Sequence, residues 1–326
     1  MQRPVVYVLM LVAAVGSWLF LDDLRPPNPT QSPLPGSNSP YPAGPSDLRV
    51  RSDVIRIASF NIQTFGQSKI RQDSVMRLIA EIIGRFDIVA IQEIRSKQQN
   101  VMPRLLEYLN QGAERYDFVI GLRKGRSANY QEQFAFVYDQ TRVEVDRYQL
   151  YSIEDPRDDL HREPYVAWFR AKSADPNEAF TFTLVNVHID PDEQEYENTL
   201  IDEIFRAVRN DGRGEDDVIM LGDFNASVGR LQELVQMPEL NWVLDEQQKT
   251  NVAGTHQYDN ICFSPMYTDE YTGRGGVSDF VREYNLLVKD GLKISDHLPV
   301  WAEFSIYEGG SHGRTARISG PSQPDR

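Results

Sequence analysis

Short apolar runs separated by polar residues recur along the chain between residues 54 and 306. Unbroken apolar runs are typical of strands covered on both faces, whereas apolar positions repeating every three or four residues are typical of helices. The pattern predicts strands over residues 54–61, 87–94, 116–121, 133–138, 142–151, 165–170, 180–189, 218–221, 258–263 and 298–306, and helices over 75–83, near 105–109, over 196–208 and near 231–235.

The order of these elements predicts the fold class. Helices lie in the first and later parts of the chain, and a long succession of strands lies between them. This order indicates an α/β sandwich rather than a regular strand–helix alternation. Residues 142–151 are expected to pair with 133–138 as a hairpin, because they follow directly in the chain.

The two ends of the chain have a different pattern. Residues 1–21 carry Arg3 and then an apolar run, which is typical of a signal peptide or of an N-terminal membrane anchor. Either reading implies export of the remainder, with an uncleaved anchor slightly favoured. Residues 22–53 are rich in Pro, Ser, Asn and Gly and are expected to form a disordered linker. Residues 307–326 are expected to be a disordered tail. The sequence thus predicts that residues 54–306 form one compact domain.

Composition limits the kind of partner and the means of stabilisation. The chain of 326 residues has 34 basic and 48 acidic residues, a formal net charge of −14. Such a protein does not attract nucleic acid by its overall field, so a polyanionic ligand would need local arginines or bound divalent cations. Cys262 is the only cysteine, which excludes an intrachain disulfide and a cysteine-based zinc site.

Polar residues follow several of the predicted strands at one end. A single residue of this kind is usually a turn residue, but a series at successive strand ends indicates a binding site. In Gly222-Asp223-Phe224-Asn225, strand spacing would put the Asp and Asn side chains on one face; alternatively, both hydrogen-bond their own backbone. The residues of the series are Asn61, Glu93, His188, Asp223, Asn225, Asp259, Asp296 and His297.

The residue types in this series restrict the chemistry. Glu93 is a hard oxygen ligand suited to Mg²⁺ or Ca²⁺. The amides of Asn61 and Asn225 can bind a phosphate oxygen or a water, and two histidines can carry protons. The chain has neither the histidine spacing of a zinc protease nor a Gly-x-Ser-x-Gly elbow. Of the hydrolytic reactions that these residue types allow, the one left is metal-assisted hydrolysis of a phosphate ester by an activated water.

Five motifs in a fixed order resemble the endonuclease/exonuclease/phosphatase superfamily, and within it the deoxyribonuclease I group. These are Phe60-Asn61-Ile62, Ile91-Gln92-Glu93, Val187-His188, Gly222-Asp223-Phe224-Asn225 and Ser295-Asp296-His297-Leu298-Pro299-Val300. The resemblance covers the whole region of 54–306. It implies a DNase I-like four-layer sandwich, in which two stacked mixed β-sheets are flanked by helices.

The resemblance also implies roles for individual residues. Glu93 would bind Mg²⁺, with Asn61 beside it and Asp296 as a further metal group. Manganese could replace magnesium, and structural calcium is also expected, although the sequence does not locate it.

Two histidines would flank the scissile phosphate in an enzyme of this group. Glu132 would orient His188, and Asp259 would orient His297. One histidine would activate water and the other would assist the leaving oxygen. Asp223 and Asn225 would position the water and the phosphate.

Three further residues would contact DNA. Arg95 and Tyr130 would enter the minor groove, where contacts carry little sequence information, and Arg162 would hold a backbone phosphate. The implied activity is cleavage of DNA with little sequence specificity by a monomeric enzyme, associated with a membrane only if its N-terminal segment stays attached. The chain departs from the group in lacking disulfides and in having Asn260 where an arginine usually follows Tyr-Asp.

Three alternatives remain open at the level of sequence. A phosphoesterase of the same fold could act on a lipid headgroup or an inositol phosphate. A non-catalytic binding protein could use the same fold. A repair nuclease for abasic sites is the weakest of the three, given the expected export and the acidic charge.

Overall fold

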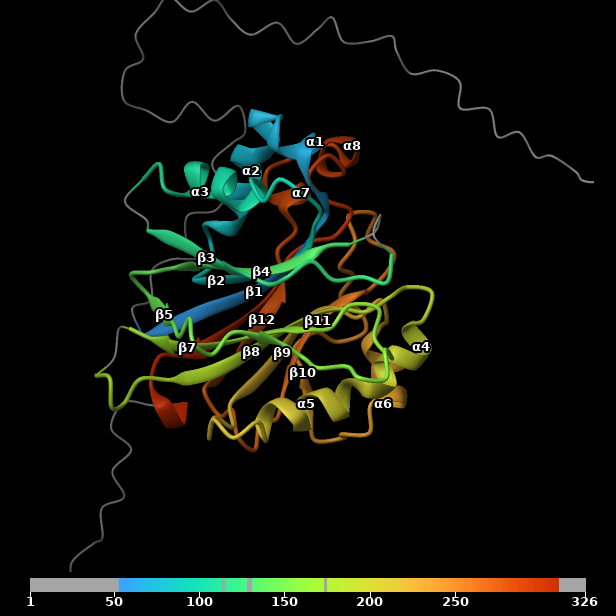
Figure 1. Ribbon diagram of the computed structural model, residues 1–326. Coiled ribbons are helices and arrows are strands. Elements are labelled where there is room, and N and C mark those ends of the chain that lie inside the picture. Colours follow the sequence, from blue (N-terminus) through green and yellow to red (C-terminus); the bar gives the residue numbers. More distant parts are fainter. Residues whose placement is uncertain (1–52, 113–114, 128–130, 173–174, 311–326) are drawn as a thin grey trace, which may run out of the picture. The chain divides into compact units, whose positions relative to one another are not determined.

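The computed structural model describes residues 53–112, 115–127, 131–172 and 175–310, and Figure 1 shows their arrangement. The predicted segments 1–21 and 22–53, apart from Asp53, lie outside the described residues, as do Tyr130 and 311–326. Among the residues that the structure describes, none of the helices combines the length and the apolar character of a membrane-spanning helix.

Two β-sheets form the centre of the domain. The first has the strand order β12-β13-β1-β2-β4-β3 and the second has the order β10-β11-β9-β8-β7-β5, with β6 also paired to β7. The strands of the first sheet are β1 (Val54–Phe65), β2 (Ile88–Ile94), β3 (Tyr116–Ile120), β4 (Gln133–Asp139), β12 (Tyr271–Val277) and β13 (Val300–Ser305). Those of the second are β5 (Val143–Val145), β6 (Tyr151–Ser152), β7 (Tyr165–Ala171), β8 (Thr181–His188), β9 (Val218–Asp223), β10 (Asn241–Trp242) and β11 (Asp259–Phe263).

Both sheets are mixed. The pair β1–β2 is parallel in the first sheet and the pair β8–β9 is parallel in the second, while the other strand pairs are antiparallel. Parallel neighbours present their carboxyl ends at the same edge of the sheet, which is where α/β proteins place binding sites.

Helices cover the outer face of each sheet, which gives four layers (Figure 1). The first sheet is covered by α1 (Gln67–Ile70), α2 (Asp73–Ile83), α3 (Val101–Leu109), α7 (Phe280–Glu283) and α8 (Val288–Gly291). The second is covered by α4 (Gln194–Glu197), α5 (Ile201–Arg209) and α6 (Val228–Leu234), with a short 3-10 turn, η2 (Asn198–Leu200), between α4 and α5. The predicted fold class is therefore confirmed.

The apolar side chains fill three layers between these elements. One cluster lies between the first sheet and its helices, one between the two sheets, and one between the second sheet and α5 and α6. The middle layer is rich in aromatic rings; Phe136 packs edge-on against Phe169 at 5.6 Å, and Phe169 stacks on Phe182 at 5.9 Å. Strands covered on both faces explain why their sequences are unbroken apolar runs.

The predicted hairpin between 133–138 and 142–151 is wrong. Within 142–151 only short strands form, and both β5 and β6 pair with β7 in the second sheet. The chain crosses from one sheet to the other directly after β4. A hydrophobic pattern identifies a strand but does not say which sheet the strand joins.

Other elements and boundaries also differ from the predictions. The predicted helix over 196–208 is broken into α4, η2 and α5, and β12 has no counterpart among the predicted strands. The folded part also continues past residue 306 into η3 (Glu308–Gly310), where Gly309 N donates to Glu270 Oε1 at 2.7 Å. Residues 307–310 therefore belong to the domain rather than to a disordered tail.

Candidate active site

Five strands bring polar side chains together at one edge of the sandwich. Parallel pairing sets His188 of β8 beside Asp223 of β9, and antiparallel pairing sets Asp259 of β11 opposite Asp223. In the first sheet, Asn61 of β1 pairs with Gln92 of β2, the residue before Glu93. The carboxyl ends of β1, β2, β8 and β9 thus meet at one site.

Gly222 allows β8 and β9 to approach closely at this site. Its φ is +154°, and a Cβ atom at this position would lie 2.0 Å from the carbonyl oxygen of Val187. Because no side chain fits there, only glycine can precede Asp223 in this geometry.

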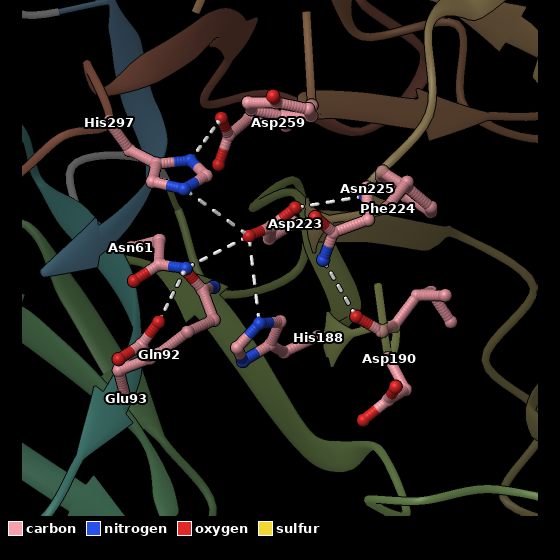
Figure 2. A network of polar contacts seen from close by, with 12 residues as sticks. Asn61, Gln92, Glu93, His188, Asp190, Asp223, Phe224, Asn225, Asp259 and His297 are labelled. Carbon is pink, nitrogen blue, oxygen red and sulfur yellow. Dashed lines mark hydrogen bonds and ion pairs between the residues drawn. The ribbon is translucent and has the colours of Figure 1, made fainter. Parts of the chain in front are cut away.

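Asp223 lies at the centre of the site (Figure 2). Its Oδ2 accepts a hydrogen bond from Asn61 Nδ2 at 2.9 Å and lies 3.6 Å from Nε2 of both His188 and His297. The Asp223 side chain is almost fully buried. A single carboxylate therefore faces both predicted catalytic histidines, and the Nε2 atoms of the two rings converge on one point.

The first histidine is held by a buried carboxylate, as the resemblance implies. His188 Nδ1 lies 2.6 Å from Glu132 Oε1, and Glu132 is inaccessible to solvent. Burial alone would raise the pKa of Glu132, but the charges of His188, Arg162 and Arg95 outweigh it and lower the pKa to about 2. Burial opposes the charge on His188, yet Glu132 raises the pKa of this histidine.

The second histidine has a matching arrangement. His297 Nδ1 lies 2.8 Å from Asp259 Oδ2, which also accepts a hydrogen bond from Thr250 Oγ1 at 2.7 Å. Burial would lower the pKa of His297, but Asp259 and Asp223 outweigh it and raise the pKa to about 10. The two neighbouring carboxylates thus favour the protonated form of His297.

Glu93 and Asn61 form the side of the site nearest the first sheet. Glu93 adopts φ +61°, a conformation that costs energy in a residue other than glycine and that is common at functional sites. Its carboxylate accepts hydrogen bonds from Asn61 Nδ2 at 3.4 Å and from Thr64 N at 2.7 Å, and it pairs with Arg95 at 3.2 Å.

These residues fit a divalent cation. Asn61 Oδ1 and Asp296 Oδ1 are buried oxygens without a hydrogen-bond partner, and each could coordinate a metal ion. Oxygen atoms of carboxylates and amides are the ligands that Mg²⁺ and Ca²⁺ prefer. Asp223, Asp259 and His297 also have ligand atoms within 4.8 Å of one another. The predicted metal residues Glu93, Asn61 and Asp296 therefore lie at one edge of the site with suitable donor atoms.

Asn225 does not lie on the strand, which corrects the predicted shared face with Asp223. Strand β9 ends at Asp223, and Asn225 has φ +49° in the loop that follows. Asn225 Nδ2 donates to the carbonyl oxygen of Ile189 at 2.8 Å, and Asn225 N donates to Asp223 Oδ1 at 2.9 Å (Figure 2). One oxygen of Asp223 thus makes the predicted turn contact, and the other faces the two histidines.

The predicted DNA-contacting arginines differ in position. Arg95 is partly exposed and pairs with Glu93 and with Glu132 at 3.3 Å. Arg162 is buried: its guanidinium donates to His188 O at 3.1 Å and lies 3.4 Å from Glu132 Oε1. The described contacts of Arg162 are with protein groups that hold His188, so its contact with a phosphate stays a prediction.

Several supporting residues were not among those predicted. Gln92 Nε2 donates to Asn186 Oδ1 at 2.7 Å and so joins the two sheets below the site. Gln63 Nε2 donates to Asp296 Oδ2 at 2.8 Å, and Lys69 Nζ donates to the carbonyl oxygen of Ile294 in the loop that carries Asp296. Gln92 and Asn186 are polar residues inside apolar strands, and that interruption is the one signal in the sequence that marks them.

Comparisons with known proteins agree with this arrangement. A model of the Endonuclease/Exonuclease/phosphatase family matches residues 58–297. Deoxyribonuclease gamma of Mus musculus is 32% identical over 269 residues, covering 78% of this chain and 84% of that protein. Deoxyribonuclease-1 of Homo sapiens is 31% identical over 265 residues, covering 76% of this chain and 90% of that protein.

Solved structures show the same fold at lower sequence identity. The human Nocturnin catalytic domain has a TM-score of 0.52 at 17% identity, covering 78% of this chain and 95% of that one. Truncated Caenorhabditis elegans TDP2 has a TM-score of 0.52 at 15% identity, covering 77% of this chain and 98% of that one. Together with the family match over residues 58–297, the comparisons confirm the predicted resemblance: the chain belongs to the Endonuclease/Exonuclease/phosphatase family.

Proposed function

We propose that this chain is a divalent-metal-dependent endonuclease that hydrolyses DNA phosphodiester bonds with little sequence specificity. The observation that carries the proposal is the pair of histidines, each held by its own buried carboxylate, whose Nε2 atoms both lie 3.6 Å from Asp223 Oδ2. The names of the relatives, deoxyribonuclease gamma and deoxyribonuclease-1, support DNA as the substrate.

The histidine contacts suggest a division of labour. Glu132 holds Nδ1 of His188 and leaves Nε2 facing the site, where it can take a proton from an attacking water. His297 has its pKa raised to about 10 by Asp259 and Asp223 despite its burial, so it carries the proton that the leaving oxygen needs. Asp223 and Asn61 orient the water and the phosphate between the two rings.

The metal site in this proposal uses Glu93, Asn61 and Asp296. A bound divalent cation, with Mg²⁺ favoured and Mn²⁺ as the alternative, would neutralise charge that develops on the phosphate oxygens. The same cation would offset the repulsion between DNA and a protein of formal net charge −14. Arg95 and Tyr130 are assigned to the DNA surface, and low sequence specificity would follow from minor-groove contacts.

The test is nicking of supercoiled plasmid by the full-length protein in Mg²⁺ or Mn²⁺, with and without EDTA. We expect EDTA to abolish nicking, and His188→Ala and His297→Ala each to lower the rate by about 10²–10⁴-fold through loss of proton transfer. His256→Ala is the matched control, because His256 is exposed. Undiminished nicking by both alanine variants, or in EDTA, would refute the proposed chemistry.

The same preparations separate the endonuclease from the rival phosphoesterase. Release of phosphocholine or of inositol phosphate at rates that exceed plasmid nicking would favour the rival. Absence of turnover on every phosphodiester tested would favour a binding protein.

We also propose that the domain is exported, on the basis of the basic and apolar pattern of residues 1–21. Cells that express the full-length chain with a C-terminal tag should hold the tag outside the cytoplasm. A tag recovered from the cytoplasmic fraction would contradict export.

A further inference from the structure

The inward faces of two central strands change from apolar to polar as they approach the candidate active site. On β8, Leu184 lies in the apolar layer between the two sheets, and Asn186 and His188 follow it at two-residue spacing on the same face. On β2, Ala90 lies in that layer and Gln92 follows it. Gln92 and Asn186 are both inaccessible to solvent. They therefore form a buried polar step between the apolar layer and the histidines.

The two amides form hydrogen bonds across the sheets, and their direction is fixed. Asn186 Nδ2 donates to the carbonyl oxygens of Ile91 and Ala135 in the first sheet, at 3.2 Å each. Its Oδ1 accepts a hydrogen bond from Gln92 Nε2 at 2.7 Å, and Gln92 Nε2 also donates to Ser59 Oγ at 3.0 Å. Both hydrogens of each amide are thus used, so neither amide can turn over without losing hydrogen bonds. The network holds β8 of the second sheet to β1, β2 and β4 of the first.

This network does not give the most stable packing that the position allows. Gln92 Oε1 is buried and has no hydrogen-bond partner among the described residues. A buried carbonyl oxygen without a donor destabilises the fold, whereas an apolar side chain of the same size would not. Stability alone therefore does not account for Gln92, which suggests that its hydrogen bonds serve the geometry of the site.

Alignment of the sheets matters because each candidate catalytic histidine and its carboxylate come from different sheets. His188 ends β8 of the second sheet, and Glu132 directly precedes β4 of the first. Asp259 begins β11 of the second sheet, whereas His297 lies shortly before β13 of the first. The contacts of 2.6 Å and 2.8 Å in these pairs both cross between the sheets. A shift of one sheet against the other would change both distances.

We propose that Gln92 and Asn186 are positioning residues, whose hydrogen bond fixes the two sheets in the alignment that brings each histidine to its carboxylate. Pairing of β1 with β2 also sets Gln92 beside Asn61, and Glu93 is its neighbour in the chain (Figure 2). Apolar contacts have no preferred direction, so the middle layer specifies the alignment less sharply than a hydrogen bond does. The positioning role rests on the proposed function, which assigns the histidines to proton transfer.

The test compares activity with stability in variants of the full-length protein. Gln92→Met removes one unpaired oxygen and leaves another, Asn186 Oδ1, so Tm should change by less than about 3 °C. Asn186→Leu takes a donor from two buried carbonyl oxygens, so its Tm should fall by about 3–8 °C. Both variants break the same hydrogen bond. Each should therefore lower kcat for plasmid nicking by about 10–100-fold at a temperature where it is folded, because small displacements of reacting groups slow a reaction strongly.

The double variant Gln92→Met/Asn186→Leu tests whether the two side chains act as one unit. If they do, its kcat should be close to that of the slower single variant, because the hydrogen bond can be lost only once. The KM for DNA should stay unchanged in all three variants, since the proposal places the effect on the reacting groups and not on the DNA surface.

Proton NMR gives a readout of alignment that needs no enzyme activity. Glu132 is an acceptor when ionised, so His188 Nδ1 carries the proton that they share, and its downfield signal reports this hydrogen bond. Glu132→Gln assigns the signal. We expect the signal to shift or disappear in Gln92→Met, although this substitution touches neither partner of the bond.

Thr183→Val is the matched control. Thr183 is also buried on β8, and its Oγ1 has no hydrogen-bond partner among the described residues. Strand alternation places it on the opposite face from Asn186, towards the layer that contains Val185 and α5. The substitution also replaces a buried polar group by an apolar one, but it should leave both kcat and the His188 signal unchanged.

Full kcat or an unshifted His188 signal in folded Gln92→Met would overturn the positioning role, and so would losses of kcat that multiply in the double variant. Should the larger substitutions prevent folding, Ser59→Ala removes only one acceptor of Gln92, and an unshifted His188 signal in that variant would overturn the role equally. A wild-type protein that nicks no DNA would refute the proposed function, whereas the NMR comparison would still decide whether Gln92 and Asn186 align the sheets.

Discussion

At the scale of single residues, Asp223 links both histidines to the loop after β9. One oxygen faces His188, His297 and Asn61, and the other accepts a hydrogen bond from Asn225 N. Loop and site are therefore fixed by the same carboxylate. A change at Asp223 would alter backbone geometry as well as chemistry, so the residues that act through the histidines give cleaner tests.

Glu132→Gln tests how far a buried carboxylate controls its histidine. The charge of Glu132 is the chief influence that raises the pKa of His188, so the amide should lower that pKa and reduce kcat by about 10–100-fold. NMR titration of the His188 ring protons measures the pKa, and plasmid nicking measures the rate. Glu163→Gln, a half-buried glutamate that pairs with Lys124, is the control and should change neither.

Glu132→Gln should also change how the free energy of unfolding depends on pH in acid. In the folded protein the pKa of Glu132 is about 2, against an ordinary value of 4.5. A lowered acid pKa stabilises the fold above pH 4.5, and the contribution disappears as the pH falls through about 2. The difference in unfolding free energy between wild type and Glu132→Gln should shrink between those pH values in urea titrations. A difference that stays constant would show that the Glu132 charge does not stabilise the fold.

Much of the site could be predicted from sequence at this scale. The pairs His188–Glu132 and His297–Asp259 form hydrogen bonds as the resemblance implied. The interior position of Arg162 could not be predicted, because burial depends on how the segment before β7 packs against β8. Asn225 was misplaced because the strand ends at Asp223, and no periodicity marks the last residue of a strand.

At the scale of elements, strands with two buried faces were easier to predict than exposed ones. Strand β9 is buried throughout and reads as an unbroken apolar run, whereas β12 contains three glycines and several exposed residues. The latter forms because β13 offers it a partner edge, which is a tertiary cause. The same limit explains the wrong hairpin: the sequence predicts strands over 142–151 and 165–170, but no local pattern shows that β5 and β6 pair with β7 rather than with β4.

Gly222→Ala tests the close approach of β8 and β9. The added methyl would lie 2.0 Å from Val187 O, which is backbone and cannot rotate away. We expect a loss of about 2–4 kcal/mol in unfolding free energy, since the strands must separate or the backbone must leave its positive φ. Urea unfolding measures the loss.

The matched control for that substitution is Gly229→Ala in α6. An added Cβ there would meet only the flexible Glu246 side chain, at 3.1 Å. Since alanine favours helices over glycine, the control should be neutral or stabilising by up to about 1 kcal/mol. Equal losses for the two variants would contradict the close-approach explanation for Gly222.

At the scale of the whole molecule, the question is where the folded domain ends. The sequence pattern predicts a last strand over 298–306 and a disordered tail from residue 307. In the structure, Glu308 N donates to Glu178 O at 2.9 Å, and Thr181 N donates to Glu308 Oε2 at 3.2 Å. Tyr307 also forms a bridge with Ala179 and packs against the middle apolar layer. These polar and glycine-rich residues carry no periodic signal, so their folding could be seen only in three dimensions.

Two truncated chains test this boundary. A chain of residues 53–310 should retain the metal-dependent nicking rate of the full-length protein, because the three apolar layers are complete within it. A chain of residues 53–306 loses the hydrogen bonds and the Tyr307 contacts and gains a terminal charge beside buried Ile306. At about 1 kcal/mol per hydrogen bond, its Tm should fall by about 5–10 °C relative to the longer chain. Equal midpoints for the two chains in EDTA would mean that residues 307–310 add nothing to the fold, and a loss of activity by the longer chain would mean that the domain needs residues beyond those described.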